Sequence, residues 1–308
     1  MLRLASSAVA IGLTLSLLTP SAQAEGRERI GYGRLISNDL IGDGRDRWQT
    51  GSYSSSYVNS SESWTGRLPT RPGVMLEYRI DAAVMSPNNL RWPDADDRPA
   101  AGHLRLALGT QFALGQLETD LQASLSFVGP ENGLIDLQTG LHDLLPGATT
   151  PSKSVRDGQV DLDPTLGARA EIGRTLSYGH AHLRPFLAAE TGVETLARAG
   201  FDLTIGTFGM GGAQARDMIT GHRYRVVEGE GRGLSFVLGG DMAHVADSQL
   251  LSDDDDMEFE STRNRLRAGV HWQTEGRNLF YGLTYLSPEF EAQDEGQTTG
   301  SVRIDWQF

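Results

Sequence analysis

The sequence predicts an all-β fold: a transmembrane antiparallel up-and-down β-barrel of about 12 strands. Three observations predict it. Apolar residues alternate with polar or small residues along most of the chain, as in strands with one face in lipid and the other toward a polar interior. Turn-forming residues and polar insertions separate these segments. The last segment alternates and is rich in aromatic residues, as is typical of bacterial outer-membrane barrels.

The N-terminus has the composition of a secretory signal peptide. Residues 1–24 contain the basic Arg3, an apolar stretch over 8–18 and the small-x-small sequence Ala22-Gln23-Ala24. We therefore expect residues 1–24 to be removed and 25–308 to form one barrel domain. An exported chain without cysteine points to a bacterial envelope.

The composition excludes several classes of protein. Without cysteine there is no disulfide scaffold, zinc finger, iron–sulfur cluster or thiol enzyme. The formal net charge of −13 and the lack of a basic stripe argue against a nucleic-acid partner.

Alternation divides the mature chain into about twelve strands. The final strand places Val302, Ile304, Trp306 and Phe308 on one face. A closed barrel has no free edge strands. The alternative, a soluble β-sandwich, has edge strands that must be protected from pairing with other chains. The expected strands cover 28–36, 49–59, 73–85, 101–114, 116–128, 161–177, 181–195, 198–208, 232–247, 258–273, 278–287 and 300–308.

Long polar insertions separate some of these strands. They cover 60–71, 86–100, 129–158, 209–221 and 248–257. Because such barrels keep periplasmic turns short and let extracellular loops grow, we expect the insertions at the extracellular end.

One insertion has the periodicity of a helix, from Pro130 to Leu145. We expect a short helix in an extracellular loop, packed by its leucines, with Gln138 and His142 one turn apart on one side. The leucines of the expected packing face are Leu134, Leu137, Leu141 and Leu144.

Several motifs occur in a recognisable order. Asn38-Asp39 is followed by Asp46-Arg47-Trp48-Gln49-Thr50-Gly51, then by Asp97-Arg98-Pro99-Ala100-Ala101-Gly102, Val128-Gly129-Pro130 and Gln138-x-x-x-His142. In this order they resemble the lipid A 3′-O-deacylase family of outer-membrane proteins (LpxR-like). The sequence departs from the family at Ala100, where the family has tyrosine, and at Ala148, where it has an acidic residue.

The resemblance implies a calcium-dependent esterase at the extracellular end of the barrel, which removes the 3′-linked acyloxyacyl chain from lipid A. It implies a catalytic role for His142, Gln138, Asn38 and Thr50 and a metal-binding role for Asp39. Arg91 falls near a site lysine of the family and is the candidate substrate-binding residue.

Elementary chemistry agrees with this assignment. The chain has no cysteine and no Gly-x-Ser-x-Gly motif, so a histidine that deprotonates water, assisted by a metal ion, is the economical route to ester hydrolysis. Asp39 is a hard oxygen ligand suited to Ca²⁺. Without the resemblance, the sequence alone favours the simpler interpretation, in which Asn38, Asp39 and Asp46 form an ordinary turn between strands and Thr50 is a routine strand residue.

The expected partners are lipid A or lipopolysaccharide and outer-membrane lipids, with the active site facing the cell surface. Two alternatives stay open: a non-catalytic outer-membrane barrel, porin-like or structural, and a soluble secreted β-protein.

Overall fold

The computed structural model describes residues 26–306 except 146 and 252–257. The expected signal peptide, residues 1–24, and Phe308 at the end of the expected last strand lie outside the described residues.

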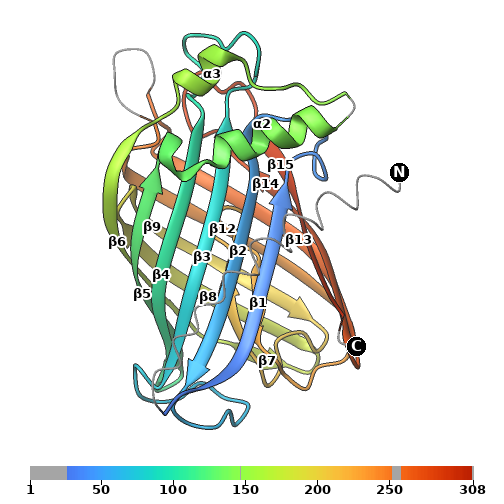
Figure 1. The fold of residues 1–308 in the computed structure, drawn as a ribbon. Helices are drawn as coiled ribbons and strands as arrows, with labels where there is room; N and C mark the ends of the chain where they lie inside the picture. Colours follow the sequence, from blue (N-terminus) through green and yellow to red (C-terminus); the bar gives the residue numbers. More distant parts are fainter. Residues whose placement is uncertain (1–25, 146, 252–257, 307–308) are drawn as a thin grey trace.

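One closed antiparallel sheet forms the wall of a barrel (Figure 1). β1 closes the barrel by pairing with β15, where Ile36 lies opposite Val302, and the short β7 (Leu176–Tyr178) only extends the β8 edge. Each of the twelve predicted segments coincides over most of its length with one wall strand, so the predicted fold is confirmed. The wall strands are β1 (Glu28–Asn38), β2 (Trp48–Ser60), β3 (Met75–Ser86), β4 (Ala101–Leu114), β5 (Leu117–Val128), β6 (Leu162–Gly173), β8 (Ala181–Thr191), β9 (Glu194–Ile205), β12 (Gly233–Ser248), β13 (Thr262–Thr274), β14 (Arg277–Leu286) and β15 (Gln297–Trp306).

The wall is apolar outside and polar inside, the reverse of a soluble protein. Leu106, Leu108 and Leu121 are exposed on the outer face, whereas Asp81 and Arg105 are buried in the lumen. Because side chains alternate between the two faces of a strand, the pattern read from the sequence becomes a lipid-facing band around a hydrophilic interior.

The two ends of the barrel differ. One end, the helix end, carries residues 129–161 with the 3₁₀ turn η1 (Pro130–Asn132), α2 (Leu134–Leu144) and α3 (Lys153–Asp157), and also the connections 39–47 and 87–100 (Figure 1). The opposite end carries the connections 61–74 and 206–232. The expectation that all long insertions share one end is therefore wrong for 60–71 and 209–221.

The connection 206–232, the lumen hairpin, folds back into the barrel. Its strands β10 (Ala213–Arg216) and β11 (Arg223–Val227) pair with each other. Tyr224 and Val226 are buried against Leu35 and Val58 on the inner wall. A Cβ at Gly31 of β1 would lie 1.9 Å from the carbonyl oxygen of Val226, so glycine is needed for this close approach. A long connection is tolerated at this end because it packs inside the barrel.

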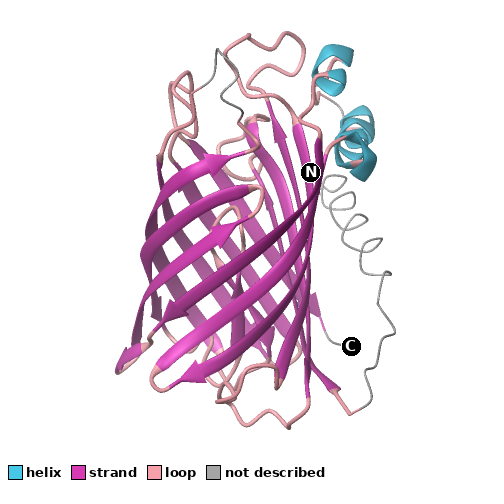
Figure 2. Cartoon of the chain, turned by 90° about the vertical axis from the view of Figure 1, so that its left-hand side faces the viewer, coloured by secondary structure: helices cyan, strands magenta, loops and turns pink. Residues whose placement is uncertain are grey.

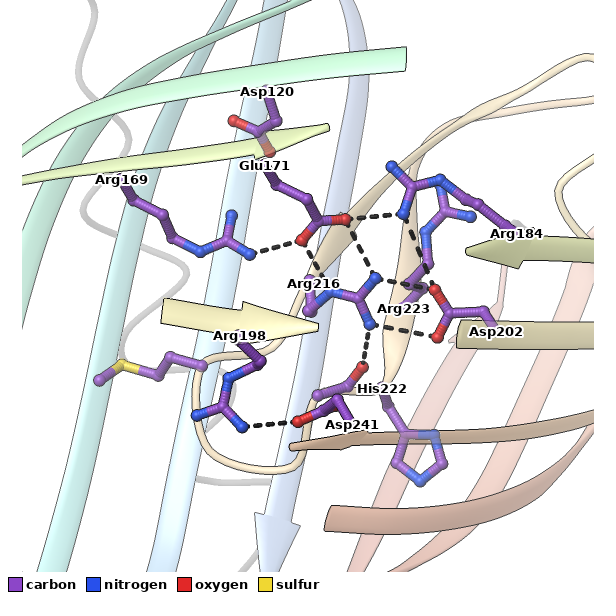
Figure 3. A network of polar contacts seen from close by, with 12 residues as sticks. Asp120, Arg169, Glu171, Arg184, Arg198, Asp202, Arg216, His222, Arg223 and Asp241 are labelled. Carbon is purple, nitrogen blue, oxygen red and sulfur yellow. Dashed lines mark hydrogen bonds and ion pairs between the residues drawn. The ribbon is translucent and has the colours of Figure 1, made fainter. Parts of the chain in front are cut away.

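Ion pairs fix the lumen hairpin to the wall (Figure 3). The guanidinium of Arg216 on β10 donates to Glu171 of β6 at 2.8 and 3.0 Å and to Asp202 of β9 at 2.7 Å. Arg216 also donates to the carbonyl oxygen of Gly221 at 2.9 Å, which shapes the hairpin tip. Nearby, Arg265 donates to Asp241 at 2.9 Å. Alternation in the sequence places these residues inside the barrel but does not reveal the hairpin that they hold.

The predicted helix is confirmed as α2, but its predicted packing face is wrong. The buried side chains of α2 are Ile135, Gln138 and Thr139, whereas Leu137 and Leu144 are 42% and 76% exposed. The polar side of the helix therefore faces the barrel and the leucines face outward. None of the helices in the described part of the chain has the length and apolar character of a membrane span.

Candidate active site

The imidazole of His142 lies near the end of α2 and is fixed at both nitrogens. Its Nδ1 lies 2.8 Å from the carbonyl oxygen of Thr149, and its Nε2 lies 3.2 Å from Oδ2 of Asp46. A carbonyl oxygen can only accept, so Nδ1 carries the proton and Nε2 is left as the nitrogen that faces Asp46. The structure thus forms a histidine–carboxylate pair between α2 and the connection 39–47.

The carboxyl group of Asp46 is in an unusual environment. Burial raises its pKa above the ordinary value, and the neighbouring His142 opposes this rise; the side chains of Thr50 and Gln138 also lie close to it. Its Oδ1 is shielded from solvent and, among the described residues, is the only such carboxylate oxygen without a hydrogen-bond partner. Such an oxygen is available to a ligand or a metal ion.

The backbone between Asp46 and Thr50 is strained. In the described part of the chain, Trp48 is the only residue other than glycine with positive φ, at 51°. The β2–β3 register shifts between Gln49 and Gly51, which leaves Thr50 as the extra residue of a β-bulge. Each such outlier costs about 1–3 kcal/mol and is common where a site needs a defined geometry. The hydroxyl oxygen of Thr50 is also buried without a hydrogen-bond partner.

Asn38 binds the neighbouring backbone. Its Nδ2 donates to the carbonyl oxygen of Thr50 at 2.9 Å, and its Oδ1 accepts from the backbone N–H of Leu40 at 2.9 Å. The backbone N–H of Asp39 donates to the same carbonyl oxygen at 3.1 Å. These bonds hold the end of β1 against the bulge in β2, so Asn38 orients the site through the backbone.

Asp39 is almost completely buried, at 1% exposure. Its Oδ2 accepts from the backbone N–H of Arg47 at 2.8 Å and from Nε2 of Gln297 at 3.4 Å. Burial raises its pKa to about 8, the Arg47 N–H opposes this rise, and the negative charges of Asp46 and Asp43 add to it. The surroundings therefore disfavour a bare negative charge on Asp39, so this carboxyl group calls for either a proton or a bound cation.

The donor set agrees with a calcium ion. No group of three or more histidine, cysteine, aspartate or glutamate side chains is placed to hold a metal among the described residues. However, Ca²⁺ accepts one or two carboxylates together with neutral oxygens and water. The buried Asp39 carboxylate, the free Oδ1 of Asp46 and the free hydroxyl of Thr50 supply oxygen donors of that kind.

The two other predicted residues differ in position. Gln138 is buried on the barrel side of α2, close to Asp46, and its amide lies 3.3 Å from the hydroxyl of Ser86. Arg91 is exposed on the connection 87–100, where its backbone N–H donates to Asn89 at 3.0 Å. The structure thus brings Gln138 and Thr50 to the His142–Asp46 pair, while the hydrogen bonds of the described residues do not link the Arg91 side chain to it.

Sequence reasoning missed two residues of the site. Asp46 opens one of the motifs, but it lies 96 residues before His142, so the sequence has no local signal that the two side chains meet. Gln297 donates from β15 to Asp39 and to the carbonyl oxygen of Arg47 at 2.6 Å. Its separation of 258 residues from Asp39 leaves no local signal in the sequence.

A closed antiparallel barrel with an apolar outer face and a polar interior is the architecture of outer-membrane β-barrel proteins, and this barrel carries a histidine–carboxylate pair at one end. The family model for "Outer membrane protein LpxR" matches residues 8–308. The chain therefore belongs to the LpxR family, the lipid A deacylase family whose motifs its sequence carries in order.

Comparison with solved structures agrees with the fold. LpxR from Salmonella typhimurium superposes with a TM-score of 0.73 at 17% identity, over 90% of this chain and 100% of that chain. The NanC porin matches over 90% of this chain and 100% of its own chain at 6% identity, but its TM-score of 0.40 is too low to bear on the fold. No curated protein matches the sequence.

Proposed function

We propose that this protein is a lipid A 3′-O-deacylase that hydrolyses the ester of the 3′-linked acyloxyacyl chain at the cell surface. The observation that carries the proposal is the His142–Asp46 pair, at 3.2 Å, at the place where the family motifs converge. His142 lies 92 residues after Thr50 and still further after Asn38-Asp39 in the sequence, yet β1, β2 and α2 bring them to one end of the barrel.

His142 is the proposed base. Because Nδ1 is held by the carbonyl oxygen of Thr149, Nε2 is the nitrogen that can take a proton from an attacking water molecule. The imidazolium ion that forms then lies beside the carboxylate of Asp46, which stabilises its charge. Asp46 would thus supply the negative charge that the family motif has six residues after the histidine, where this chain has Ala148.

Asp39 is the proposed ligand of the calcium ion, with Asp46 Oδ1 and the Thr50 hydroxyl as further oxygen donors. When bound, Ca²⁺ supplies positive charge that polarises an ester carbonyl. Asn38 fixes Asp39 through the backbone of Thr50. Gln138 lies one helical turn before His142 and can orient the water molecule or the ester.

Arg91 is the proposed substrate-binding residue. Arg91 is exposed, so its guanidinium can bind a phosphate of lipid A. Its connection is held next to the segment after α2, because the backbone N–H of Ser152 donates to the carbonyl oxygen of Leu90 at 2.8 Å.

The decisive experiment is mass spectrometry of lipid A from a bacterial host without a deacylase of its own. Lipid A from cells that express the protein should be lighter by the mass of the 3′ acyloxyacyl group. Lipid A from cells that express folded His142→Ala should keep its full mass. Heat-modifiable migration on gels verifies folding of both proteins. Unchanged lipid A with the folded wild-type protein, in whole cells and in detergent micelles with calcium, would overturn the proposal.

The porin-like alternative is less well supported. The lumen hairpin occupies the interior between β1, β6 and β9 and is fixed there by Arg216. A solute would have to displace it.

A further inference from the structure

Helix α2 has three distinct faces. Ile135, Gln138, Thr139 and His142 face the barrel. Asp136 and Asp143 are exposed on one flank. At about 100° per residue, the four leucines lie together on the other flank, centred about 130° from each of these two sets, with Leu134 next to Gln138. We call this flank the leucine face; it consists of Leu134, Leu137, Leu141 and Leu144.

The leucine face is unpartnered within the described chain over much of its area. Leu137 and Leu144 are 42% and 76% exposed, and Leu134 and Leu141 are partly exposed. A water-exposed helix rarely keeps four leucines on one face, because burying them is favourable.

The leucine face begins on the outside of the barrel wall. A Cβ at Gly102 of β4 would lie 3.0 Å from the Cβ of Leu134, so Leu134 rests directly on that glycine. His103 and Arg105 of β4 point into the lumen, where they contact Ser126 and Asp81. By strand alternation Gly102 therefore points outward.

The outward row of β4 continues from Gly102 to Leu104, Leu106 and Leu108, and the last two are 42% and 48% exposed. This row is part of the lipid-facing band of the barrel. Leu134 extends it by one step, from the strand to the helix. Figure 2 shows both helices beside the outer surface of the wall rather than over the lumen.

We infer that the leucine face of α2 is inserted among the acyl chains of the membrane leaflet next to the helix end of the barrel. The continuity of the leucine face with the lipid-facing band selects lipid as its occupant. The position of Asp136 and Asp143 on the opposite flank agrees, since it leaves the acidic side of the helix toward water. α2 is thus an interfacial amphipathic helix whose third side carries His142.

This insertion adds a specificity element to the proposed function. If α2 lies among the acyl chains of the leaflet, its base, His142, is at the level of the ester bonds of a lipid in that leaflet. The enzyme would then act on lipid A that remains in the membrane. The inference does not need the protein to be a deacylase, since the helix can insert whatever reaction the site performs.

The chain has no cysteine, so single cysteines for nitroxide labels can be introduced without background. Leu137→Cys and Leu144→Cys report on the leucine face, and Asp136→Cys and Asp143→Cys are matched controls on the same helix. Leu108→Cys on the outer face of β4 is the reference for lipid. The labelled proteins are reconstituted into phosphatidylethanolamine–phosphatidylglycerol vesicles, and label accessibility to oxygen and to a water-soluble nickel chelate is measured.

The expected result is that labels at 137 and 144 behave as the label at 108 does, accessible to oxygen and protected from nickel, while labels at 136 and 143 show the reverse. Equal nickel accessibility at all four helix positions would overturn the inference. Protection of 137 and 144 from both reagents would also overturn it, and with dipolar broadening it would identify a second copy of the chain as the occupant.

Activity provides a second, separable test that rests on the proposed function. Leu137→Glu together with Leu144→Glu should reduce deacylation of lipid A in vesicles by at least about tenfold. The rate on lipid A dispersed in detergent micelles should stay within about twofold. An equal loss in both media would contradict the membrane role. If neither the variant nor the wild type shows activity, the deacylase proposal fails, and the label accessibilities still decide the insertion.

Discussion

The lumen and the helix-end site treat charge in opposite ways. In the lumen, Glu171 accepts hydrogen bonds from the guanidinium groups of Arg184 at 2.7 Å and Arg216 at 2.8 Å (Figure 3). Asp202 accepts from Arg216 and also from Arg267, both at 2.7 Å. At the site, Asp39 accepts only from neutral N–H donors within the described residues, at 2.8 and 3.4 Å.

The difference separates a structural role from a functional one. Burying a carboxylate is costly unless it is paired, and the lumen meets that cost with arginine. The site leaves Asp39 without an ion-pair partner among the described residues and Oδ1 of Asp46 without any hydrogen-bond partner, on a backbone strained at Trp48. Unbalanced negative charge and free oxygens are suited to a cation and a substrate. Changes at the site should therefore alter the reaction, and changes in the lumen should alter the barrel.

The largest expected effect on the rate is that of His142→Ala. Loss of the base should reduce the rate of lipid A deacylation by about two to four orders of magnitude. The barrel should remain folded, because His142 lies on α2 and takes no part in strand pairing. The measurement is a mass-spectrometric time course of lipid A in detergent micelles. A folded variant that works at the wild-type rate would remove His142 from the mechanism.

Calcium removal should come next. Chelation of Ca²⁺ from the purified protein, or the substitution Asp39→Ala, should lower the rate by roughly a thousandfold, the kinetic equivalent of several kcal/mol of charge stabilisation. Titration calorimetry should detect calcium binding to the wild type and none to the variant. Micelles are needed, since chelators also strip divalent cations from lipopolysaccharide. Full activity in excess chelator would show that the metal is not used.

Asp46→Asn tests the carboxylate that faces the base. Asparagine keeps the size of the side chain but cannot stabilise an imidazolium ion by charge, so the rate should fall by about ten- to a hundredfold. Asp43→Asn is the matched control, because Asp43 lies on the same connection and pairs with Arg47 at 3.6 Å instead. An equal loss of rate in the two variants would show that Asp46 acts only as one of several negative charges around the site and not as the specific partner of His142.

The comparison also shows what the sequence could predict. Strand positions follow from alternation, because each residue of a membrane barrel faces either lipid or lumen. The twelve strands and α2 were therefore predictable. Alternation carries no information on what fills the lumen. It therefore does not predict the lumen hairpin or the ion pairs of Arg216 that hold it, and it places the insertion 209–221 at the wrong end of the barrel.

The site was predictable only in part. The ordered motifs indicated His142, Gln138 and Asn38-Asp39, which the fold brings to one end, although their roles remain proposals. The pairing of His142 with Asp46 depends on how α2 crosses the strand ends, and the contact of Gln297 with Asp39 depends on barrel closure. The leucine stripe predicts a packing face against protein because leucines are usually buried there. In a membrane protein lipid is the competing apolar environment, and α2 turns its polar side inward.

A smaller effect is expected for Arg91→Ala. If its exposed guanidinium binds a phosphate of lipid A, the variant should raise KM by about three- to tenfold with kcat nearly unchanged, and added salt should narrow the difference. Arg67→Ala, an exposed arginine at the opposite end, is the control. A change in kcat alone, with KM as in the wild type, would contradict a binding role.

The smallest effect on the rate should come from the lumen, and it completes the comparison. Gly31→Val places a side chain where a Cβ alone would lie 1.9 Å from the carbonyl oxygen of Val226, so β11 must move away from the wall. Gly31 and Asn38 are seven residues apart on β1, or about 23 Å. We therefore expect the rate in micelles to stay within about twofold, while the unfolding temperature on gels falls and ion conductance appears in planar bilayers. Gly115→Val, in the turn between β4 and β5 at the end opposite the site, is the control, because no atoms lie within 4 Å of its Cβ position, although its φ of +64° adds local strain. A large loss of rate in a folded Gly31→Val protein, with no gain in conductance, would show that the lumen hairpin supports the site directly and that the two regions are not separate.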